Sequence, residues 1–279
     1  MTAAERLYIW EGEPLEHWRR AWGLPELHIF EAVGSTNDVL RALALSGAPA
    51  GTTVLAEVQT AGRGRGGRTW HAPERSSLLM SILLRPSVIA EGGLAPGSIP
   101  LRLGLAIARA VEPFVERPIG VKWPNDVVAP GAGKIAGILC EGSIVGRDAY
   151  LVAGIGVNVN QRKTDFPPEV RDIATSLASL TRRGVSRAAV AGAILRAIQS
   201  SVLTRGGPLQ EDELMEIGRR DVLRSHDVTV DGEPYGTAVS IAPDGALCVR
   251  MPDGRIVPVY SGTVRIGGRK DSHRRETYP

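Results

Sequence analysis

A loop rich in glycine and arginine is the first segment whose residues could do chemistry. It reads Gly-Arg-Gly-Arg-Gly-Gly-Arg over residues 62–68. Three arginines this close together repel one another unless an anion lies among them, and guanidinium groups bind phosphate or carboxylate in a bidentate manner. The glycines let backbone N–H groups approach a ligand. The segment indicates an anion-binding loop, although a solvated basic surface loop could have the same composition.

The spacing of these glycines only partly fits known nucleotide-binding patterns. Gly62, Gly64 and Gly67 match the GxGxxG fingerprint, but that fingerprint requires a helix to follow at once. Residues 69–73, Thr-Trp-His-Ala-Pro, form a helix poorly, and no Gly-Lys-Ser/Thr follows the glycines. We therefore expect neither a dinucleotide-binding fold nor a P-loop.

A second candidate segment, residues 120–126, presents a lysine, an amide and a carboxylate at one turn. Pro124 fixes the backbone of that turn, and Lys122, Asn125 and Asp126 flank it. Such a group could hold a phosphate and its magnesium ion. The alternative is a structural turn in which Asn125 and Asp126 satisfy backbone groups.

Two further strand-like segments carry polar groups that suit a ligand cleft. Lys134 opens the apolar run 134–141. It would be either a solvated edge residue or a cation directed into a cleft, where it would neutralise a carboxylate and a phosphate. In the segment 154–160, glycines allow close approach, and Asn158 and Asn160 share a face because they are two residues apart. These asparagines would be either ligand contacts or ordinary residues at a strand end.

The tripeptide Ser35-Thr36-Asn37 precedes an apolar stripe of helical spacing. Ser35 is a favourable N-cap residue, and a helix N-terminus offers N–H groups and a partial positive charge. Small hydroxyl and amide groups at this place could hydrogen-bond a neutral polar head such as a ureido ring. Helix capping does not exclude such a role.

These segments have to be positioned by a domain that mixes helices and strands. Hydrophobic periodicity separates the two kinds of element, and glycine, proline and capping residues mark their ends. The expected helices cover residues 35–46, 101–114, 186–204 and 209–220, and the expected strands cover residues 52–58, 77–84, 119–123, 126–129, 134–142 and 149–159.

From residue 225 the pattern changes to short β-prone runs separated by tight turns. Asp-Gly pairs occur at 231–232, 244–245 and 253–254, and Ser-Gly at 261–262. Asp-Gly between alternating runs is the strongest short-range signal for a hairpin. A small β-barrel or sandwich of about 45 residues is therefore expected.

The overall composition excludes several classes of protein. The chain has 279 residues, a net charge of +3 and two cysteines, Cys140 and Cys248. No apolar run reaches the roughly 18–20 residues of a membrane span, and the first residues do not resemble a secretory signal. The histidines are scattered, so a zinc site is not expected. These features are typical of a cytoplasmic protein with reduced thiols.

Taken together and in this order, the five segments resemble the biotin–protein ligase family. The family pattern reads Ser-Thr-Asn, then Gln-x-Ala-Gly-Arg-Gly-Arg-x-Gly-Arg-x-Trp, Lys-Trp-Pro-Asn-Asp, Lys-x-Ala-Gly-Ile-Leu-x-Glu and Gly-x-Gly-x-Asn. In this chain it occupies residues 35–37, 59–70, 122–126, 134–141 and 154–158 without a departure. The resemblance covers about residues 30–266.

The resemblance implies an α+β fold: a large mixed-sheet catalytic domain of the biotin/lipoate ligase type with a small C-terminal SH3-like β-barrel. In this chain the catalytic domain would cover residues 30–222 and the barrel residues 223–268. Residues 1–29 would form an N-terminal arm packed on the catalytic domain, and residues 269–279 a polar tail.

The resemblance also implies a two-step reaction. Biotin would be activated with ATP to biotinyl-5′-AMP and pyrophosphate, and the biotinyl group would pass to a lysine of a biotin carboxyl carrier protein. ATP with Mg²⁺ and biotin would be required, without a prosthetic group. The implied catalytic residues are Lys134, Arg63 and Arg65; biotin would be bound by Ser35, Thr36, Asn37, Gln59, Gly62, Arg63, Gly64, Arg65, Lys134 and Gly137; ATP would be bound by Arg63, Arg65, Arg68, Trp70, Lys122, Asn125, Asp126, Lys134 and Asn158; and Asp126 is the candidate magnesium ligand.

Three other functions compete with this interpretation. A lipoate–protein ligase shares the catalytic architecture, but the segment 59–70 favours biotin. A repressor of the same family would need an N-terminal helix-turn-helix of about 60 residues, whereas 34 residues precede Ser35, so no sequence-specific DNA binding is expected. A non-catalytic biotin sensor is disfavoured because the positions expected to contact ATP are filled. The resemblance leaves open whether the protein is a monomer or a homodimer.

Overall fold

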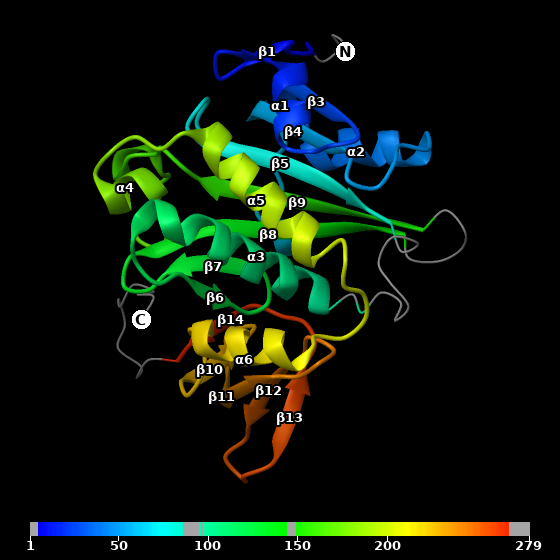
Figure 1. Cartoon of the computed structure of the whole chain (residues 1–279). Helices are drawn as coiled ribbons and strands as arrows, with labels where there is room; N and C mark the ends of the chain where they lie inside the picture. Colours follow the sequence, from blue (N-terminus) through cyan, green and yellow to red (C-terminus); the bar gives the residue numbers. More distant parts are fainter. Residues whose placement is uncertain (1–4, 86–94, 96, 144–148, 268–279) are drawn as a thin grey trace.

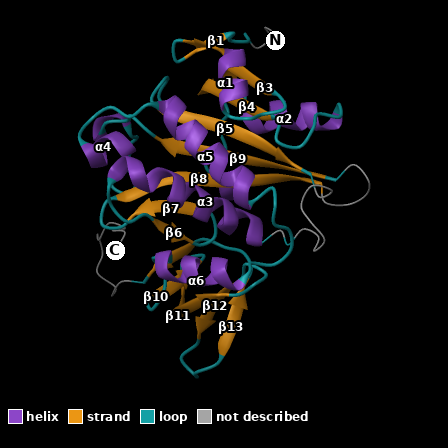
Figure 2. Ribbon diagram, viewed as in Figure 1, coloured by secondary structure: helices purple, strands orange, loops and turns teal. Residues whose placement is uncertain are grey.

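A seven-stranded mixed sheet forms the centre of the larger part of the chain (Figures 1 and 2). The computed structural model describes residues 5–85, 95, 97–143 and 149–267. The strands lie in the order β3-β4-β5-β9-β8-β7-β6; β3 and β4 are parallel and every other pair is antiparallel. Their bounds are β3 Leu27–Val33, β4 Thr53–Gln59, β5 Ser77–Leu84, β6 Gly120–Lys122, β7 Asp126–Ala129, β8 Gly133–Ser143 and β9 Tyr150–Asn158.

Helices cover both faces of this sheet. Helices α3 (Ser98–Val115) and α5 (Arg187–Ser201) pack against each other and against one face. Helix α2 (Thr36–Leu45) packs on β4, β5 and β9. Because neighbouring residues of a strand point to opposite faces, Ile82 joins the hydrophobic cluster of α3 and α5, whereas Leu83 joins the cluster of α2. The two helix layers therefore lie on opposite sides of the sheet.

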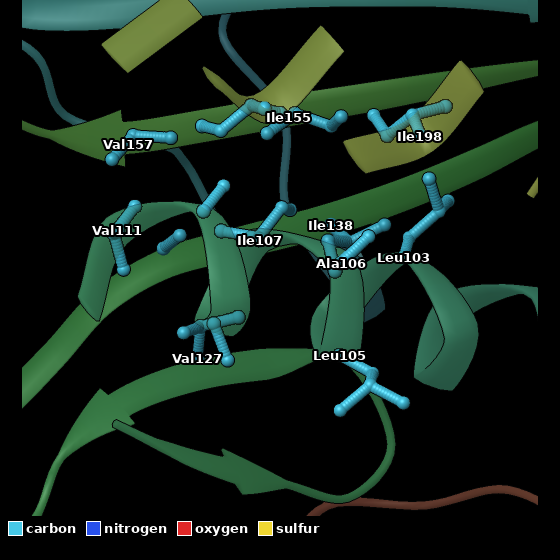
Figure 3. Packing of buried hydrophobic residues seen from close by; sticks show 14 of the residues in the cluster. Leu103, Leu105, Ala106, Ile107, Val111, Val127, Ile138, Ile155, Val157 and Ile198 are labelled. Atoms are coloured by element: carbon cyan, nitrogen blue, oxygen red, sulfur yellow. The ribbon is translucent and has the colours of Figure 1, made fainter. Parts of the chain in front are cut away.

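The hydrophobic core lies mainly between the sheet and helices α3 and α5. Figure 3 shows Leu103 and Ile107 of α3 facing Ile138 and Ile155 of the sheet, with Ile198 of α5 beside them. All five side chains are at most 2% exposed. Burial of each such side chain contributes roughly 1.5–3 kcal/mol, so this layer holds the strands of the site in register.

The N-terminal segment is tied to the part of the chain that holds the large sheet by buried charges. A short hairpin, β1 (Ile9–Trp10) and β2 (Glu13–Pro14), leads into α1 (Leu15–Ala21). The indole of Trp10 donates to Glu57 Oε1 at 2.5 Å, and Arg187 Nη1 donates to Glu57 Oε2 at 2.6 Å. Arg187 also pairs with Glu11. A buried charge is stable only with such partners, so these residues fix the segment on β4 and α5.

The C-terminal part is a separate antiparallel sheet of five strands in the order β13-β12-β11-β10-β14. Asp231-Gly232, Asp244-Gly245 and Asp253-Gly254 lie in its tight turns, as predicted, and all three glycines have positive φ. Among the described residues no pairing joins the edge strands β13 and β14, so the sheet is not closed into a barrel. The strands are β10 Asp227–Val230, β11 Glu233–Ile241, β12 Leu247–Arg250, β13 Ile256–Val259 and β14 Val264–Ile266.

Helix α6 (Glu211–Arg220) lies between the two sheets and contacts α3, β6 and β11 (Figure 1). Arg102 of α3 binds Glu213 of α6 through Nε (2.6 Å) and Nη2 (2.9 Å), and both side chains are almost fully buried. The indole of Trp123 donates to the carbonyl oxygen of Gly245 at 2.9 Å. The C-terminal sheet is thus docked on the part that holds the large sheet through specific polar contacts.

Most predicted elements are confirmed, with some differences. Strand β3 is an edge strand of the large sheet that was not predicted, and its first three residues fall in the predicted arm. Helix α3 begins at Ser98, three residues earlier than predicted, and a short helix α4 (Leu177–Thr181) was not predicted. The predicted tail, 269–279, lies outside the described residues. Among the residues that are described, no helix has the length and apolarity that crossing a membrane requires.

Asp221 lies at the junction between α6 and the C-terminal sheet. Its Oδ1 accepts from the backbone N–H of Leu223 at 2.9 Å, whereas its buried Oδ2 has no hydrogen-bond partner among the described residues. Burial raises the pKa of Asp221 from 3.8 to about 6. The folded state therefore binds a proton at Asp221 that the unfolded state releases at lower pH.

This difference predicts a pH-dependent cost of ionising Asp221. Between pH 4 and pH 7 the natural chain should lose on the order of 2 kcal/mol of unfolding free energy relative to Asp221→Asn, because stability falls with pH where the folded state binds more protons. The loss should grow through pH 6 and then level off. Urea unfolding of both proteins at a series of pH values measures it, and a pH-independent difference would contradict the assignment.

Candidate functional site

A single cavity collects the residues that the sequence analysis selected. It has a volume of about 480 Å³ and lies beside the N-terminus of α2 and strands β5, β8 and β9. Of the predicted site residues, only Gly62 is not part of its lining. Those that line it are Ser35, Thr36, Asn37, Gln59, Arg63, Gly64, Arg65, Arg68, Trp70, Lys122, Asn125, Asp126, Lys134, Gly137 and Asn158.

Three glycines make room for this cavity on the sheet. Gly137 of β8 and Gly156 of β9 are paired across the two strands. A Cβ atom at Gly156 would lie 2.7 Å from Cζ2 of Trp70, and one at Gly137 would lie 2.9 Å from Cζ3 of the same ring. A Cβ atom at Gly154 would lie 3.0 Å from Cγ of Asn37. Real Cβ atoms need more space than this, so the bare backbone allows both side chains to pack on the sheet.

One end of the cavity is a network of neutral hydrogen-bonding groups. Gln59 Oε1 accepts from the backbone N–H of Thr36 (2.8 Å) and from its hydroxyl (3.0 Å). The buried hydroxyl of Ser81 donates to Asn37 Oδ1 (2.6 Å) and lies 2.7 Å from Thr36 Oγ1. These contacts fix the side chains in place, as a site for a neutral polar group requires.

Ser35 occupies the predicted N-cap position of α2, but not with a capping side chain. Its backbone is extended, and its hydroxyl makes no capping hydrogen bond. Gln59 accepts from the first N–H of the helix in its place. The side chain of Ser35 is therefore not used by the helix, and it lines the cavity instead.

Other lining residues of the cavity are charged. Lys134 Nζ lies 2.6 Å from Asp126 Oδ1 and 5.4 Å from the centroid of the Trp70 ring. The indole nitrogen of Trp70 is buried without a hydrogen-bond partner among the described residues. Lys134 is thus a cation directed into the cleft, which decides between the two alternatives for this residue. An ion pair with one carboxylate leaves its other N–H groups able to donate to an anion.

The predicted asparagines are anchored to the backbone. Asn125 Nδ2 donates to the carbonyl oxygen of Ile138 at 2.7 Å, and Asn158 Nδ2 donates to that of Lys134 at 3.3 Å. Asn160 instead exchanges two hydrogen bonds with the backbone of Val185, each 2.9 Å long. Asn125 and Asn158 therefore shape the cavity wall, whereas Asn160 joins two segments outside it.

The glycine- and arginine-rich loop folds back on itself over the cavity. The backbone N–H of Gly64 donates to the carbonyl oxygen of Arg68 at 2.6 Å, and that of Trp70 donates to the carbonyl oxygen of Gly62 at 3.0 Å. Gly66 and Gly67 have φ values of 63° and 74°, which favour glycine. Burial lowers the pKa of Arg65, so an anion at this place would be favoured.

Two groups of lining residues were not found by the sequence analysis. Residues from 166 to 174 supply Phe166, Glu169, Val170, Ile173 and Ala174, and residues 262–265 of the C-terminal sheet supply a further part of the wall. Neither group carries a motif. The Ser-Gly pair at 261–262 indicated a turn, but not that the turn faces the cavity.

Magnesium is the one metal that the sequence analysis associates with this site. Within the described ranges, no group of three or more His, Cys, Asp or Glu side chains could hold a metal ion. Mg²⁺ commonly binds through one or two carboxylates together with substrate phosphates. Asp126 could supply one carboxylate, so the residues fit an ion held mainly by a bound nucleotide.

Comparisons with known proteins identify the family. The Biotin/lipoate A/B protein ligase family matches residues 29–158, and the Biotin protein ligase C terminal domain matches residues 228–267. The biotin–[acetyl-CoA-carboxylase] ligase of Mycobacterium tuberculosis is 36% identical over 255 residues, which are 87% of this chain and 89% of that protein. The chain belongs to the biotin protein ligase family. The bifunctional ligase/repressor BirA of Bacillus subtilis is 34% identical over 245 residues, covering 85% of this chain and 73% of that protein.

Solved structures of biotin protein ligases have the same fold. The Aquifex aeolicus enzyme in complex with biotin and ATP has a TM-score of 0.72 at 30% identity, covering 88% of this chain and all of that one. The Leishmania major enzyme in complex with biotinyl-5-AMP has a TM-score of 0.60 at 29% identity, covering 85% of this chain and 99% of that one. The family and the predicted mixed-sheet fold are thereby confirmed, and the chain is a ligase.

The close approach of Trp70 to the sheet predicts the effect of one added methyl group in this biotin protein ligase. Gly156→Ala should displace the indole and cost about 1–3 kcal/mol of unfolding free energy, as overpacking does. Gly184→Ala is the matched control, because a Cβ atom there meets nothing within 4 Å; it should leave stability unchanged or raise it by up to about 1 kcal/mol. Urea unfolding followed by tryptophan fluorescence measures both, and equal unfolding curves would refute the packing argument.

Proposed function

We propose that this chain joins biotin to a biotin carboxyl carrier protein in two steps. Biotin and ATP first give biotinyl-5′-AMP and pyrophosphate, and the biotinyl group then passes to a lysine of the carrier. In this proposal residues 30–222 form the catalytic domain and residues 223–268 a C-terminal domain docked on it. The similar structures support this proposal, since the Aquifex aeolicus enzyme is in complex with biotin and ATP and the Leishmania major enzyme with biotinyl-5-AMP.

One observation carries the proposal: the same cavity has a neutral hydrogen-bonding end and a cationic side. Thr36, Asn37 and Gln59 offer fixed donors and acceptors that suit the ureido ring of biotin. Lys134 and Arg65 offer positive charge that suits a carboxylate and a phosphate. A ligand with a neutral polar head and an anionic tail therefore suits the chemistry of the residues that line the cavity.

In the first step, a carboxylate oxygen of biotin attacks the α-phosphorus of ATP. The new C–O–P bond forms as the bond from that phosphorus to the bridging oxygen of pyrophosphate breaks. Both reactants are anions, so the main task of the protein is to hold them together against repulsion. Lys134 would lie between the two groups, and Arg65 would cover the phosphate. Arg68, Trp70 and Lys122 would contact the nucleotide.

In the second step, the neutral amine of the carrier lysine attacks the carbonyl carbon of the anhydride. AMP leaves with the electrons of the broken C–O bond, and the amine loses a proton as the amide forms. No enzyme nucleophile is required. Cys140 does not suit that role, because burial raises the pKa of its thiol to about 12, and the thiolate is the reactive form.

Magnesium would be held by the phosphates of the nucleotide and by Asp126. When bound, the ion would neutralise phosphate charge and orient the leaving pyrophosphate. Asp126 already pairs with Lys134, so the lysine remains positioned by the same carboxylate.

The first test is the exchange of labelled pyrophosphate into ATP in the presence of biotin, with lipoate and with no added acid as controls. Exchange that depends on biotin supports the proposal. Exchange that depends on lipoate alone would make the chain a lipoate ligase. If folded protein with magnesium shows no exchange with either acid, that result would contradict an adenylation reaction. Transfer of biotin to a purified carrier domain then tests the second step.

Lys134→Gln should abolish most of the first step without unfolding the protein. We expect the exchange rate to fall about 10²–10³-fold, the typical loss when a group that stabilises developing charge is removed. Lys134→Arg keeps the charge and should lose less. A Lys134→Gln protein with an exchange rate within threefold of the natural chain would exclude a direct role for the lysine.

Arg65→Gly should release the intermediate before transfer. Removing this guanidinium exposes the anhydride to solvent, so biotinyl-5′-AMP should escape and biotinylate lysines of an added bystander protein such as serum albumin. Arg75→Gly is the matched control, because Arg75 is an exposed arginine that follows the loop. Loss of all activity without bystander labelling would show that Arg65 does not retain the intermediate.

A further inference from the structure

Two carboxylates that do not line the cavity hold the guanidinium of Arg63, which does line it. Nη1 and Nη2 of Arg63 donate to Oδ2 and Oδ1 of Asp38 at 2.7 and 2.8 Å, and Nη2 also donates to Glu141 Oε2 at 3.2 Å. Arg41 approaches both carboxylates, at 3.2 and 3.6 Å. We call Asp38 and Glu141 the Arg63 clasp. The pairing with Asp38 raises the pKa of Arg63 and lowers that of Asp38.

The neighbouring arginine of the loop has no comparable contact. Among the described residues, the guanidinium of Arg65 has no hydrogen-bond partner, and burial lowers its pKa. Arg63 is thus saturated on one edge by protein carboxylates, whereas Arg65 is available to an anion. These contacts of Arg63 use three of its five N–H groups. The two arginines therefore differ in their contacts even though they share a motif.

Stability alone does not explain the clasp. The side chains of Arg63, Asp38 and Glu141 are 36%, 46% and 28% exposed. Ion pairs this exposed typically contribute only about 0–1 kcal/mol. The geometry is more informative, because three segments meet there: the glycine-rich loop, the first turn of α2 and β8.

The clasp is also joined to the neutral end of the cavity. Asn37 Nδ2 donates to Glu141 Oε2 at 2.7 Å, and Asn37 Oδ1 accepts from Ser81. Glu141 therefore contacts Arg63 and Asn37 at once. Neither Asp38 nor Glu141 lines the cavity, so any effect on a ligand has to pass through Arg63 or Asn37.

We propose that Asp38 and Glu141 are positioning residues that hold Arg63, and with it the first half of the glycine-rich loop, in place before a ligand binds. The proposal rests on the function proposed above, because it assigns the clasp to biotin binding. A loop that is already positioned loses less conformational freedom on binding, and affinity rises accordingly. The guanidinium of Arg65, which no carboxylate among the described residues holds, stays available to the ligand.

The main experiment compares Asp38→Asn/Glu141→Gln with the natural chain in biotin-dependent pyrophosphate exchange. KM for biotin should rise about tenfold, as expected when a preorganised contact is lost, while kcat changes less than twofold. The single variant Asp38→Glu, which keeps a carboxylate at this position, should retain most of the affinity of the natural chain for biotin. Asp253→Asn is the control: it removes a carboxylate from an exposed ion pair with Arg255 in the C-terminal sheet, and it should change neither constant.

A double-mutant cycle separates the clasp from a general structural effect. In an Arg63→Gln background, Asp38→Asn should raise KM for biotin no further, because residues that act through one partner are not additive. Additive effects would overturn the proposal. The proposal would also be overturned if the natural chain is active and the Asp38→Asn/Glu141→Gln variant has the same KM for biotin.

A measurement without any ligand distinguishes failure of the inference from failure of the proposed function. Trypsin cleaves after arginine, so the rate of cleavage after Arg63, Arg65 and Arg68, identified by mass spectrometry, reports how firmly the loop is held. The Asp38→Asn/Glu141→Gln variant should be cut about tenfold faster there, since the cleavage rate follows the population of the open loop. Equal rates would overturn the clasp, whereas faster cleavage without biotin-dependent exchange in the natural chain would refute only the proposed substrate.

Discussion

The rest of the site depends on one patch of the large sheet where three glycines leave one face without side chains. Gly137, Gly154 and Gly156 lie on adjacent central strands whose backbone groups are paired with each other. The strands can therefore be bare without leaving buried polar groups unsatisfied. Asn37 and Trp70 pack directly on this surface, which brings the helix N-terminus and the glycine-rich loop to the same cavity.

Two cations of the site are already paired with carboxylates of the protein. Lys134 is held by Asp126, and Arg63 by Asp38, before any ligand is present. A cation that already has a partner does not have to be desolvated alone, which is the costly part of burying charge. Arg65 differs, since burial disfavours its charged form, and an anion would remove that cost. The site thus combines fixed cations with one that gains most from a ligand.

The sequence predicted the parts of the fold and site that depend on local patterns. The continuous apolar run of β5 and the tight turns of the C-terminal sheet were assigned correctly, because periodicity and turn residues specify them. Strand β3 was missed, since its sequence Leu-His-Ile-Phe-Glu-Ala-Val begins inside the predicted N-terminal arm, residues 1–29. Its pairing with β4 is a tertiary property.

Where glycine, arginine and lysine occur in motifs, the sequence selected residues that the structure places around one cavity. Its remaining parts depend on contacts between distant residues: Arg63 pairs with Asp38 and Glu141, 25 and 78 positions away. No spacing rule indicates such pairs. The same holds for residues 166–174, whose apolar and acidic side chains line the cavity only because the chain returns to β8, where Lys134 bridges to Ala174.

The contribution of the C-terminal sheet to the cavity wall has a thermodynamic consequence. Residues 262–265 line the cavity together with residues of the large sheet, and Trp123 is bonded to Gly245 across the junction. A ligand that touches both walls binds the docked arrangement more tightly than any separated one. By reciprocity it strengthens the docking by the same free energy, about 2.7 kcal/mol when the ligand is present at a hundredfold excess over its Kd and binds only the docked form. Occupancy of the cavity and cohesion of the two sheets are therefore one coupled equilibrium.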